Sequence, residues 1–220
     1  IRNKGYYPKG LLQMLNVKYI IHSQKGDIPF FTSIDNKYNM NYFFSSSDRL
    51  KTIETFIYES DDFLDRIFIV NEINLIDSDD EILNKLTSDS FDPAFKSYIN
   101  PNYLTEQQLL LVKSVKNSNN SSVKMISWEP DKIQFKSVTD KPQIILLSEI
   151  YYPGWVINEE NVEIIRINGL FRGIIVPEGE NVYTMKFQPQ DIKFGKLISN
   201  FSYFILICLF SIAMYRRKNA

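Results

Sequence analysis

Hydrophobic and polar positions alternate regularly in the second half of the chain. Between Lys132 and Val138 the alternation predicts one buried face with Ile133, Phe135 and Val138, while the lysines and glutamine between them face water. Short strands separated by turns rich in Pro, Gly, Asn and Asp are typical of a β-sandwich or a jelly roll. We therefore expect a sandwich-like lobe over residues 122–192. Its strands are predicted at 123–127, 132–138, 143–148, 155–157, 162–167, 171–176 and 182–188.

The first half of the chain has a less regular pattern. A short helix is expected to end near Leu15, a buried strand to follow at 17–21, and two further strands to lie at 55–58 and 66–70. Ser78 and the acidic run after it predict a capped helix that ends near Leu86. Residues 25–49 lack periodicity and are expected to form an irregular excursion. These elements predict a smaller mixed α/β lobe over 1–116, joined to the second lobe by an exposed link at 113–122, so the fold class is α+β and mostly β.

The last apolar stretch has the properties of a transmembrane helix. Leu197–Tyr215 contains 19 residues without a charge, and at ~1.5 Å per residue such a helix just spans a hydrocarbon layer of roughly 30 Å. Arg216, Arg217 and Lys218 follow it, and basic clusters favour the cytoplasmic side. We therefore expect a membrane span at 196–215, a cytoplasmic tail at 216–220 and an extracytoplasmic domain before the span. The lipid bilayer is the first expected partner.

Charge and composition narrow the classes of function. The charges of the 25 basic and 26 acidic residues nearly cancel, so we expect no nucleic-acid partner. The single cysteine, Cys208, lies in the apolar stretch, which leaves no intrachain disulfide and no cysteine-based metal site. The single histidine, His22, is expected to be structural, and the acidic run at 79–81 to start a helix. We expect no metal, no cofactor and no catalytic residue in these 220 residues.

Several motifs together carry a resemblance to a known family. The central motif is the run Leu147–Trp155, which contains Tyr151-Tyr152-Pro153-Gly154-Trp155. It is preceded by motifs at 15–20, Tyr58-Glu59, 66–70 and Phe91-Asp92-Pro93. It is followed by motifs at 164–168, Phe171-Arg172-Gly173 and 176–179. In order and spacing, and with the closing apolar helix, they resemble the carboxy-terminal region of the YfhO family of bacterial multi-pass membrane proteins.

The resemblance implies a place in a larger enzyme. Members of the family resemble C-type glycosyltransferases, which transfer a sugar from a polyprenyl-phosphate carrier to an acceptor outside the cytoplasmic membrane. The resemblance implies that the residues for sugar transfer lie in upstream loops. This part of the protein is therefore expected to be non-catalytic and to position an acceptor or brace the membrane helices. The chain begins at Ile1 without a signal region, so upstream transmembrane helices are expected partners, with a glycan or lipid-linked sugar acceptor as a further one. The alternative is a structural or carbohydrate-binding ectodomain without transferase activity.

One group of residues is a candidate ligand site. Aromatic rings stack on the apolar faces of sugars, and charged groups bind their hydroxyls. The candidates are Glu149, Tyr151, Tyr152, Trp155, Asn168 and Arg172.

A structural role is the competing interpretation of these six residues. Tyr151 and Trp155 would then be core anchors, while Arg172 would brace the turn through carbonyls or through an ion pair with Glu149. A hydrolytic carboxylate pair of Glu149 and Glu163 is a further possibility.

Overall fold

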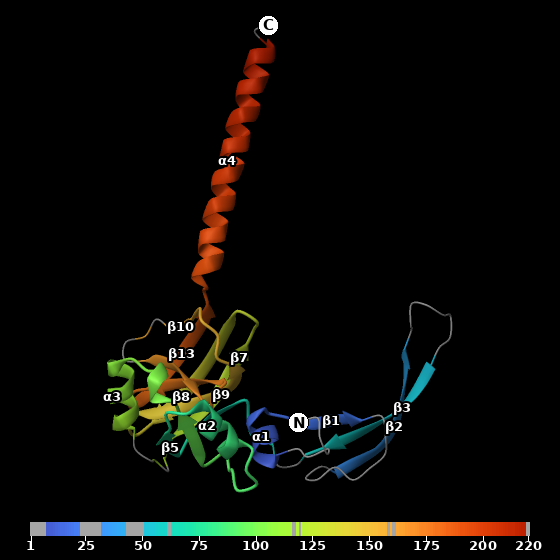
Figure 1. The fold of residues 1–220 in the computed structure, drawn as a ribbon, viewed down its shortest axis with the longest axis vertical. Coiled ribbons are helices and arrows are strands. Elements are labelled where there is room, and N and C mark those ends of the chain that lie inside the picture. Colours follow the sequence, from blue (N-terminus) through green and yellow to red (C-terminus); the bar gives the residue numbers. More distant parts are fainter. Residues whose placement is uncertain are drawn as a thin grey trace.

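The computed structural model describes residues 8–22, 32–42, 51–60, 63–115, 118, 120–157, 159 and 162–218. Within these residues the chain is mostly β, with several antiparallel sheets, some helices and one apolar C-terminal helix (Figure 1). The elements in chain order are α1 (Lys9–Met14), β1 (Tyr19–His22), β2 (Thr32–Tyr42), β3 (Lys51–Glu59), β4 (Ile67–Ile69), β5 (Glu72–Leu75), α2 (Asp79–Leu86), β6 (Lys96–Ile99), the 3₁₀ helix η1 (Pro101–Tyr103), α3 (Glu106–Ser114), β7 (Ser122–Trp128), β8 (Lys132–Thr139), β9 (Gln143–Ile150), β10 (Trp155–Ile157), β11 (Glu163–Ile167), β12 (Phe171–Val176), β13 (Gly179–Phe187) and α4 (Gln190–Lys218).

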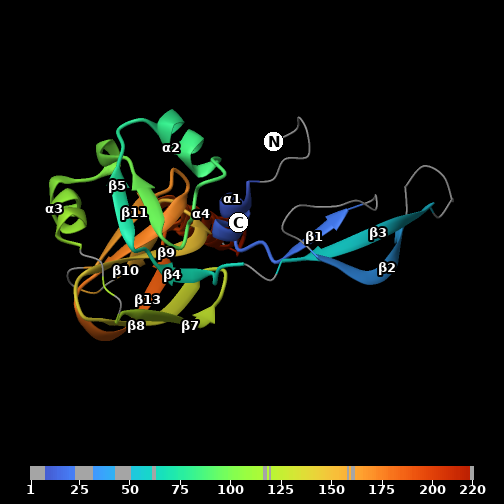
Figure 2. The same cartoon turned by 90° about the horizontal axis from the view of Figure 1, so that it is seen from below.

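Two four-stranded antiparallel sheets form the body of the domain. One has the order β10-β13-β8-β7 and the other the order β11-β12-β9-β4. A parallel pair, β5 and β6, lies beside them with α2 and α3 (Figure 2). The strands predicted in the second half of the chain are confirmed, each within three residues of its expected ends.

The strands β9 and β12 are buried on both faces. Alternate residues of β9 enter different hydrophobic clusters: Ile144 and Leu146 belong to a cluster with α1, α2 and α3, whereas Ile145 and Leu147 belong to a cluster shared by both four-stranded sheets. Every residue of β12 is buried. These two strands therefore link the two clusters of the domain.

The first cluster draws residues from both predicted lobes. Met14, Ile82 and Val112 from the first range pack with Ile165 and Phe171 from the second, and β4 of the first range pairs with β9 of the second. The two predicted ranges, 1–116 and 122–192, therefore share a hydrophobic cluster and do not have one separate core each.

Beyond this body, β1, β3 and β2 form a three-stranded antiparallel sheet that extends to one side (Figures 1 and 2). The strand β2 lies inside 25–49, so the prediction of an irregular excursion is wrong for residues 32–42. The strand expected at 17–21 is present as β1, but Tyr19 and Ile21 are exposed and the expectation that it is buried is also wrong. The β-branched run indicated a strand, and its burial depended on a covering layer that sequence does not reveal.

Local signals in the first half predicted the helix α2 correctly. The Ser78 side chain accepts a hydrogen bond from the Glu81 backbone N–H at 3.3 Å, and the acidic residues of the first turn complement the helix dipole. A full capping box of Thr105 and Gln108 starts α3. These caps fix where the helices begin beside the sheets.

One detail of the alternation in β8 differs from the prediction. Ile133 and Phe135 are buried as expected, but the next buried side chain on that face is Ser137, and Val138 is exposed. Positions 133, 135 and 137 share one face because the side-chain period of a strand is two. The expectation for Val138 is therefore wrong.

The helix α4 leaves the body as a single long rod (Figure 1). By length and composition it is long and apolar enough to cross a membrane, and its apolar window is not buried by any described residue. It begins at Gln190, so fewer than two turns precede the stretch expected at 196–215. Gly154, at φ 109°, approaches Pro189 so closely that a Cβ would lie 2.9 Å from the Pro189 Cα.

We predict that Leu146→Ala and Leu147→Ala each lower the free energy of unfolding by about 2–5 kcal/mol, because each removes a fully buried side chain. One cooperative transition is expected in both variants, since β9 belongs to both clusters. Chemical unfolding followed by circular dichroism measures this, with the exposed Leu110→Ala of α3 as the control. Two separate transitions, only one of them shifted by each variant, would contradict the prediction.

Candidate functional site

Arg172 is the buried centre of the predicted site. Its strand β12 is central in its sheet, and the side chain is almost fully buried. The guanidinium carbon lies 4.2 Å from the centroid of the Trp155 ring, and Nη2 donates a hydrogen bond to the Ile150 carbonyl at 3.1 Å. The predicted bracing of the turn through a carbonyl is therefore confirmed.

The charge of Arg172 is only partly compensated. Its Nε and Nη1 atoms are buried and have no hydrogen-bond partner among the described residues. Burial lowers the pKa of Arg172 to about 10, and the nearby charge of Glu149 acts in the opposite direction. The guanidinium stays protonated at neutral pH, held by the Trp155 ring and one carbonyl.

Glu149 forms its ion pair with a residue that was not among the predicted site residues. Its Oε1 atom lies 3.0 Å from the Arg66 Nη1 atom, and it also accepts a hydrogen bond from the Trp128 indole N–H at 3.1 Å. The Arg66 guanidinium lies 4.5 Å from the centroid of the Trp128 ring. The expected ion pair of Glu149 with Arg172 is replaced by this arrangement, because the register of β4 against β9 brings Arg66 next to Glu149.

We call Arg66, Trp128 and Glu149 the outer cluster. Trp128 is 49% exposed, and the two charged side chains are partly exposed. A register shift between Met125 and Ser127 pairs Trp128 with the buried Ile133, so the indole lies at the margin of the face that is turned toward the other four-stranded sheet and is half-exposed there. An exposed indole beside a carboxylate offers both a stacking surface and hydrogen-bonding groups.

The three aromatic candidates differ in burial. Trp155 is half-buried and contacts Phe187 with ring centroids 5.4 Å apart, so its predicted structural role is supported by packing against the core. Tyr151 and Tyr152 are 36% and 59% exposed, and the interpretation of Tyr151 as a core anchor is wrong. Tyr152 also contacts Phe187, with centroids 6.0 Å apart. The loop that carries both tyrosines is held by the Tyr151 N–H, which donates to the Leu170 carbonyl.

Asn168 lies apart from the other candidates, in the turn between β11 and β12. It is buried with φ 49°, and its Oδ1 atom accepts a hydrogen bond from the Tyr98 N–H at 2.7 Å. Its Nδ2 atom donates to Ser97 and to the Met14 sulfur. These contacts join the turn to β6 and α1, which is a structural role.

The pair of Glu149 and Glu163 does not have the geometry of a hydrolytic site. Glu163 is level with Ile175 of β12, and Ile175 is level with Ile144 of β9. Glu149 lies five positions beyond Ile144, roughly 15 Å along the strand, whereas an inverting pair needs roughly 6.5–9.5 Å. Among the described residues no group of three or more His, Cys, Asp or Glu side chains is arranged to hold a metal ion.

Arg66, Trp128 and Phe187 were not among the predicted site residues. The side-chain period of β7 gives no signal for Trp128, because the register shift between Met125 and Ser127 moves Trp128 to the face that pairs with Ile133. Phe187 and Arg66 are brought to the site by strand pairing, β10 with β13 and β4 with β9. Nothing in a single sequence specifies those pairings.

These features define a class: a mostly β domain with an exposed aromatic and charged cluster, ending in one candidate membrane-spanning helix. No protein-family model matches the chain, and comparisons with curated proteins and with solved structures found no match. The ligand-binding role of the six predicted residues stays a prediction.

We predict that the two tryptophans of the chain respond differently to substitution. Trp155→Ala removes contacts with Phe187 and Arg172 and should cost about 3 kcal/mol of unfolding free energy. Trp128→Ala, at an exposed position, should cost at most about 1 kcal/mol. Urea unfolding of both variants, measured side by side, checks this, and equal losses would assign Trp128 a structural role as well.

Proposed function

We propose that this chain is the extracytoplasmic C-terminal domain and last membrane span of a polyprenyl-phosphate-sugar-dependent membrane glycosyltransferase of the cell envelope, similar to the YfhO family. The part described is non-catalytic and positions an acceptor or braces the membrane helices. The paired four-stranded sheets act as a sandwich-like support, since residues of both sheets share one hydrophobic cluster.

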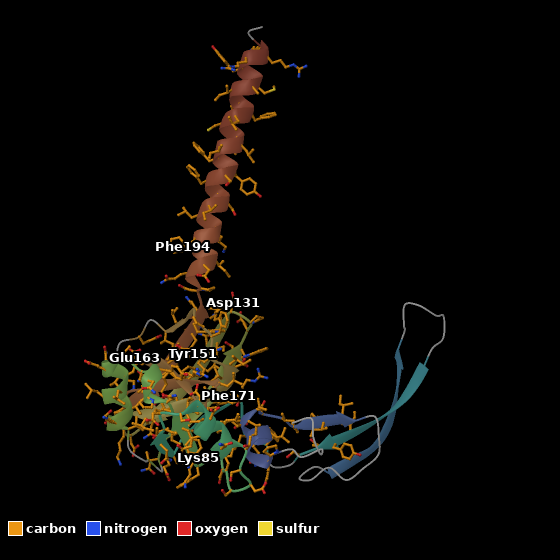
Figure 3. All side chains as sticks on the ribbon, in the orientation of Figure 1. Lys85, Asp131, Tyr151, Glu163, Phe171 and Phe194 are labelled. Carbon is orange, nitrogen blue, oxygen red and sulfur yellow. The ribbon has the colours of Figure 1, made fainter. Side chains whose placement is uncertain are left out.

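One observation carries the proposal: the outer cluster lies at the end of the body from which α4 departs. Trp128 is followed by the β7–β8 turn, and the Asp131 carbonyl in this turn accepts a hydrogen bond from the Phe187 N–H, shortly before α4 begins. Asp131 lies near the base of α4, and Lys85 lies at the opposite end of the body (Figure 3). If α4 crosses the membrane, Trp128 and Glu149 are held close to its surface, where a membrane-linked acceptor would be presented.

The chemistry of the cluster fits binding of an envelope glycan. The exposed Trp128 ring provides an apolar stacking surface, and Glu149 and Arg66 provide an acceptor and donors for hydroxyl or phosphate groups. Tyr152 adds a second exposed ring near the base of α4.

The second candidate function is a structural or carbohydrate-binding ectodomain without transferase activity, and the same cluster supports it. The two differ in the sequence upstream of Ile1. Several hydrophobic spans with a carboxylate in an outward-facing loop support the transferase, because sugar transfer needs a base or a metal ligand. Upstream hydrophobic spans whose outward-facing loops lack such a carboxylate support the ectodomain without transferase activity.

We predict that the body of the domain is outside the cell and the end of α4 inside. In a Cys208→Ser background, a membrane-impermeant maleimide applied to intact bacteria should label Leu110→Cys, which is exposed on α3, and should leave Lys218→Cys unlabelled until the cells are permeabilised. The reverse pattern would contradict the proposed topology.

We further predict that the full chain in lipid nanodiscs binds lipoteichoic acid and that Trp128→Ala weakens this binding roughly tenfold, as expected for a central aromatic contact. Phe95→Ala, an exposed aromatic residue outside the outer cluster, is the matched control. Surface plasmon resonance measures both. Binding that is unchanged in Trp128→Ala would remove the outer cluster from the acceptor site.

A further inference from the structure

A cavity of about 410 Å³ lies between α1, α2 and the turn that joins β11 to β12. Its volume falls within the roughly 300–1,000 Å³ range of small-molecule sites. The walls are predominantly apolar, and Met14 on the floor is fully buried. The residues that line it are Leu11, Met14, Leu15, Asp79, Ile82, Leu83, Leu86, Arg166, Asn168, Gly169, Leu170 and Phe171.

Three leucines of the lining are exposed to solvent. Leu15, Leu83 and Leu170 come from three different elements. Apolar side chains converging on a cavity from separate elements form a surface that gains free energy when an apolar ligand removes it from water. Gly169, at φ 69°, leaves room there, because a Cβ would meet only the Ile82 Cγ2 atom, at 3.9 Å.

Arg166 and Asp79 are the two charged groups of the cavity lining. The Arg166 Nε atom donates to the Gly169 carbonyl, and the guanidinium lies 4.7 Å from the centroid of the Tyr103 ring. Its Nη2 atom is 3.8 Å from the Asp79 Oδ2 atom, an ion pair longer than a hydrogen bond. Arg166 is thus held in place while its terminal nitrogens keep donor capacity.

Asp79, in contrast, is already engaged at both carboxylate oxygens. Oδ1 accepts from Asn100 at 2.9 Å and Oδ2 from the Tyr103 hydroxyl at 2.7 Å. These two hydrogen bonds, Tyr103 first, lower the pKa of Asp79, so it stays ionised at neutral pH. A ligand head group at this position would therefore meet guanidinium donors beside a carboxylate that already binds Asn100, Tyr103 and Arg166.

We propose that this cavity binds a small amphiphile with an apolar tail and a single carboxylate head, the tail lying among the leucines and Met14 and the head accepting hydrogen bonds from the terminal nitrogens of Arg166. The cavity is separate from the outer cluster. Arg166 suits the head because guanidinium and carboxylate groups match in geometry as well as in charge. A cationic head would have to compete with Asn100, Tyr103 and Arg166 for Asp79 and would be repelled by Arg166.

The experiment follows the methyl resonances of methionine in the full chain in nanodiscs. Octanoate, octyl glucoside and octylammonium, which share one tail length, are titrated at neutral pH. The Met14 methyl resonance, assigned by Met14→Leu, should shift saturably, and that of Met185, which lies in the other cluster, should stay in place. Octanoate should bind at least about tenfold more tightly than octylammonium, with octyl glucoside between them.

Two variants make the proposal refutable. Leu83→Trp, at a 56% exposed position of α2, should fill the cavity and weaken octanoate binding at least about tenfold; Leu110→Trp, 70% exposed on α3, should leave it unchanged. Arg166→Gln should remove the preference for octanoate and retain the binding of octyl glucoside. A Met14 resonance that does not move, equal affinities for the three heads, or unchanged binding in Leu83→Trp would overturn the proposal.

Discussion

The double burial of β9 and β12 is the constraint on which the rest of the domain depends. An antiparallel sheet can leave one face to water, but here the central strands have a hydrophobic cluster on each side. The sequence of β9, Gln-Ile-Ile-Leu-Leu, satisfies both faces with consecutive apolar residues. Gly173 in β12 leaves room for the side chain of its cross-strand partner Ile165, because a Cβ there would lie 2.9 Å from it. The helices on one side and the second sheet on the other are thereby fixed relative to one another.

The two sites lie at the same end of these strands, on different faces of the sheet. On the face of the second cluster, a register shift between Phe171 and Arg172 of β12 interrupts the pairing with β9, next to the loop that carries Tyr151 and Tyr152. Bulges of this kind re-aim side chains at sheet edges, and here Arg172 packs under the Trp155 ring. The β11–β12 turn, tied down by Asn168, instead contributes to the apolar cavity beside α1 and α2.

The sequence predicted the parts of the fold that depend on local pattern. The strands of the second half, the Ser78 cap and the apolar C-terminal helix follow from periodicity, cap chemistry and length, which are encoded within about ten to twenty residues. The predictions that are wrong concern side-chain partners and burial, which depend on contacts between segments far apart in the sequence. The pairing of β4 with β9 gave Glu149 the partner Arg66 instead of Arg172, and Tyr151 is exposed because no described layer covers its loop. Of the six predicted site residues, Trp155 and Arg172 lie together, Tyr152 shares Phe187 with Trp155, and Asn168 lies elsewhere.

The charges around Glu149 connect the structural and the proposed functional roles. Two arginines interact with this carboxylate. Arg66 forms an ion pair with it at the surface, and its negative charge also stabilises the buried Arg172 guanidinium. The group therefore carries a net positive charge of one, and the buried guanidinium is screened by water much less than an exposed one. Glu129 and Asp131 of the adjoining β7–β8 turn add two negative charges next to Trp128, so charge alone does not select an anionic ligand at this end of the domain. If an acceptor binds here as proposed, it meets an indole face, guanidinium donors and a carboxylate together, a combination that suits a glycan with or without phosphate groups.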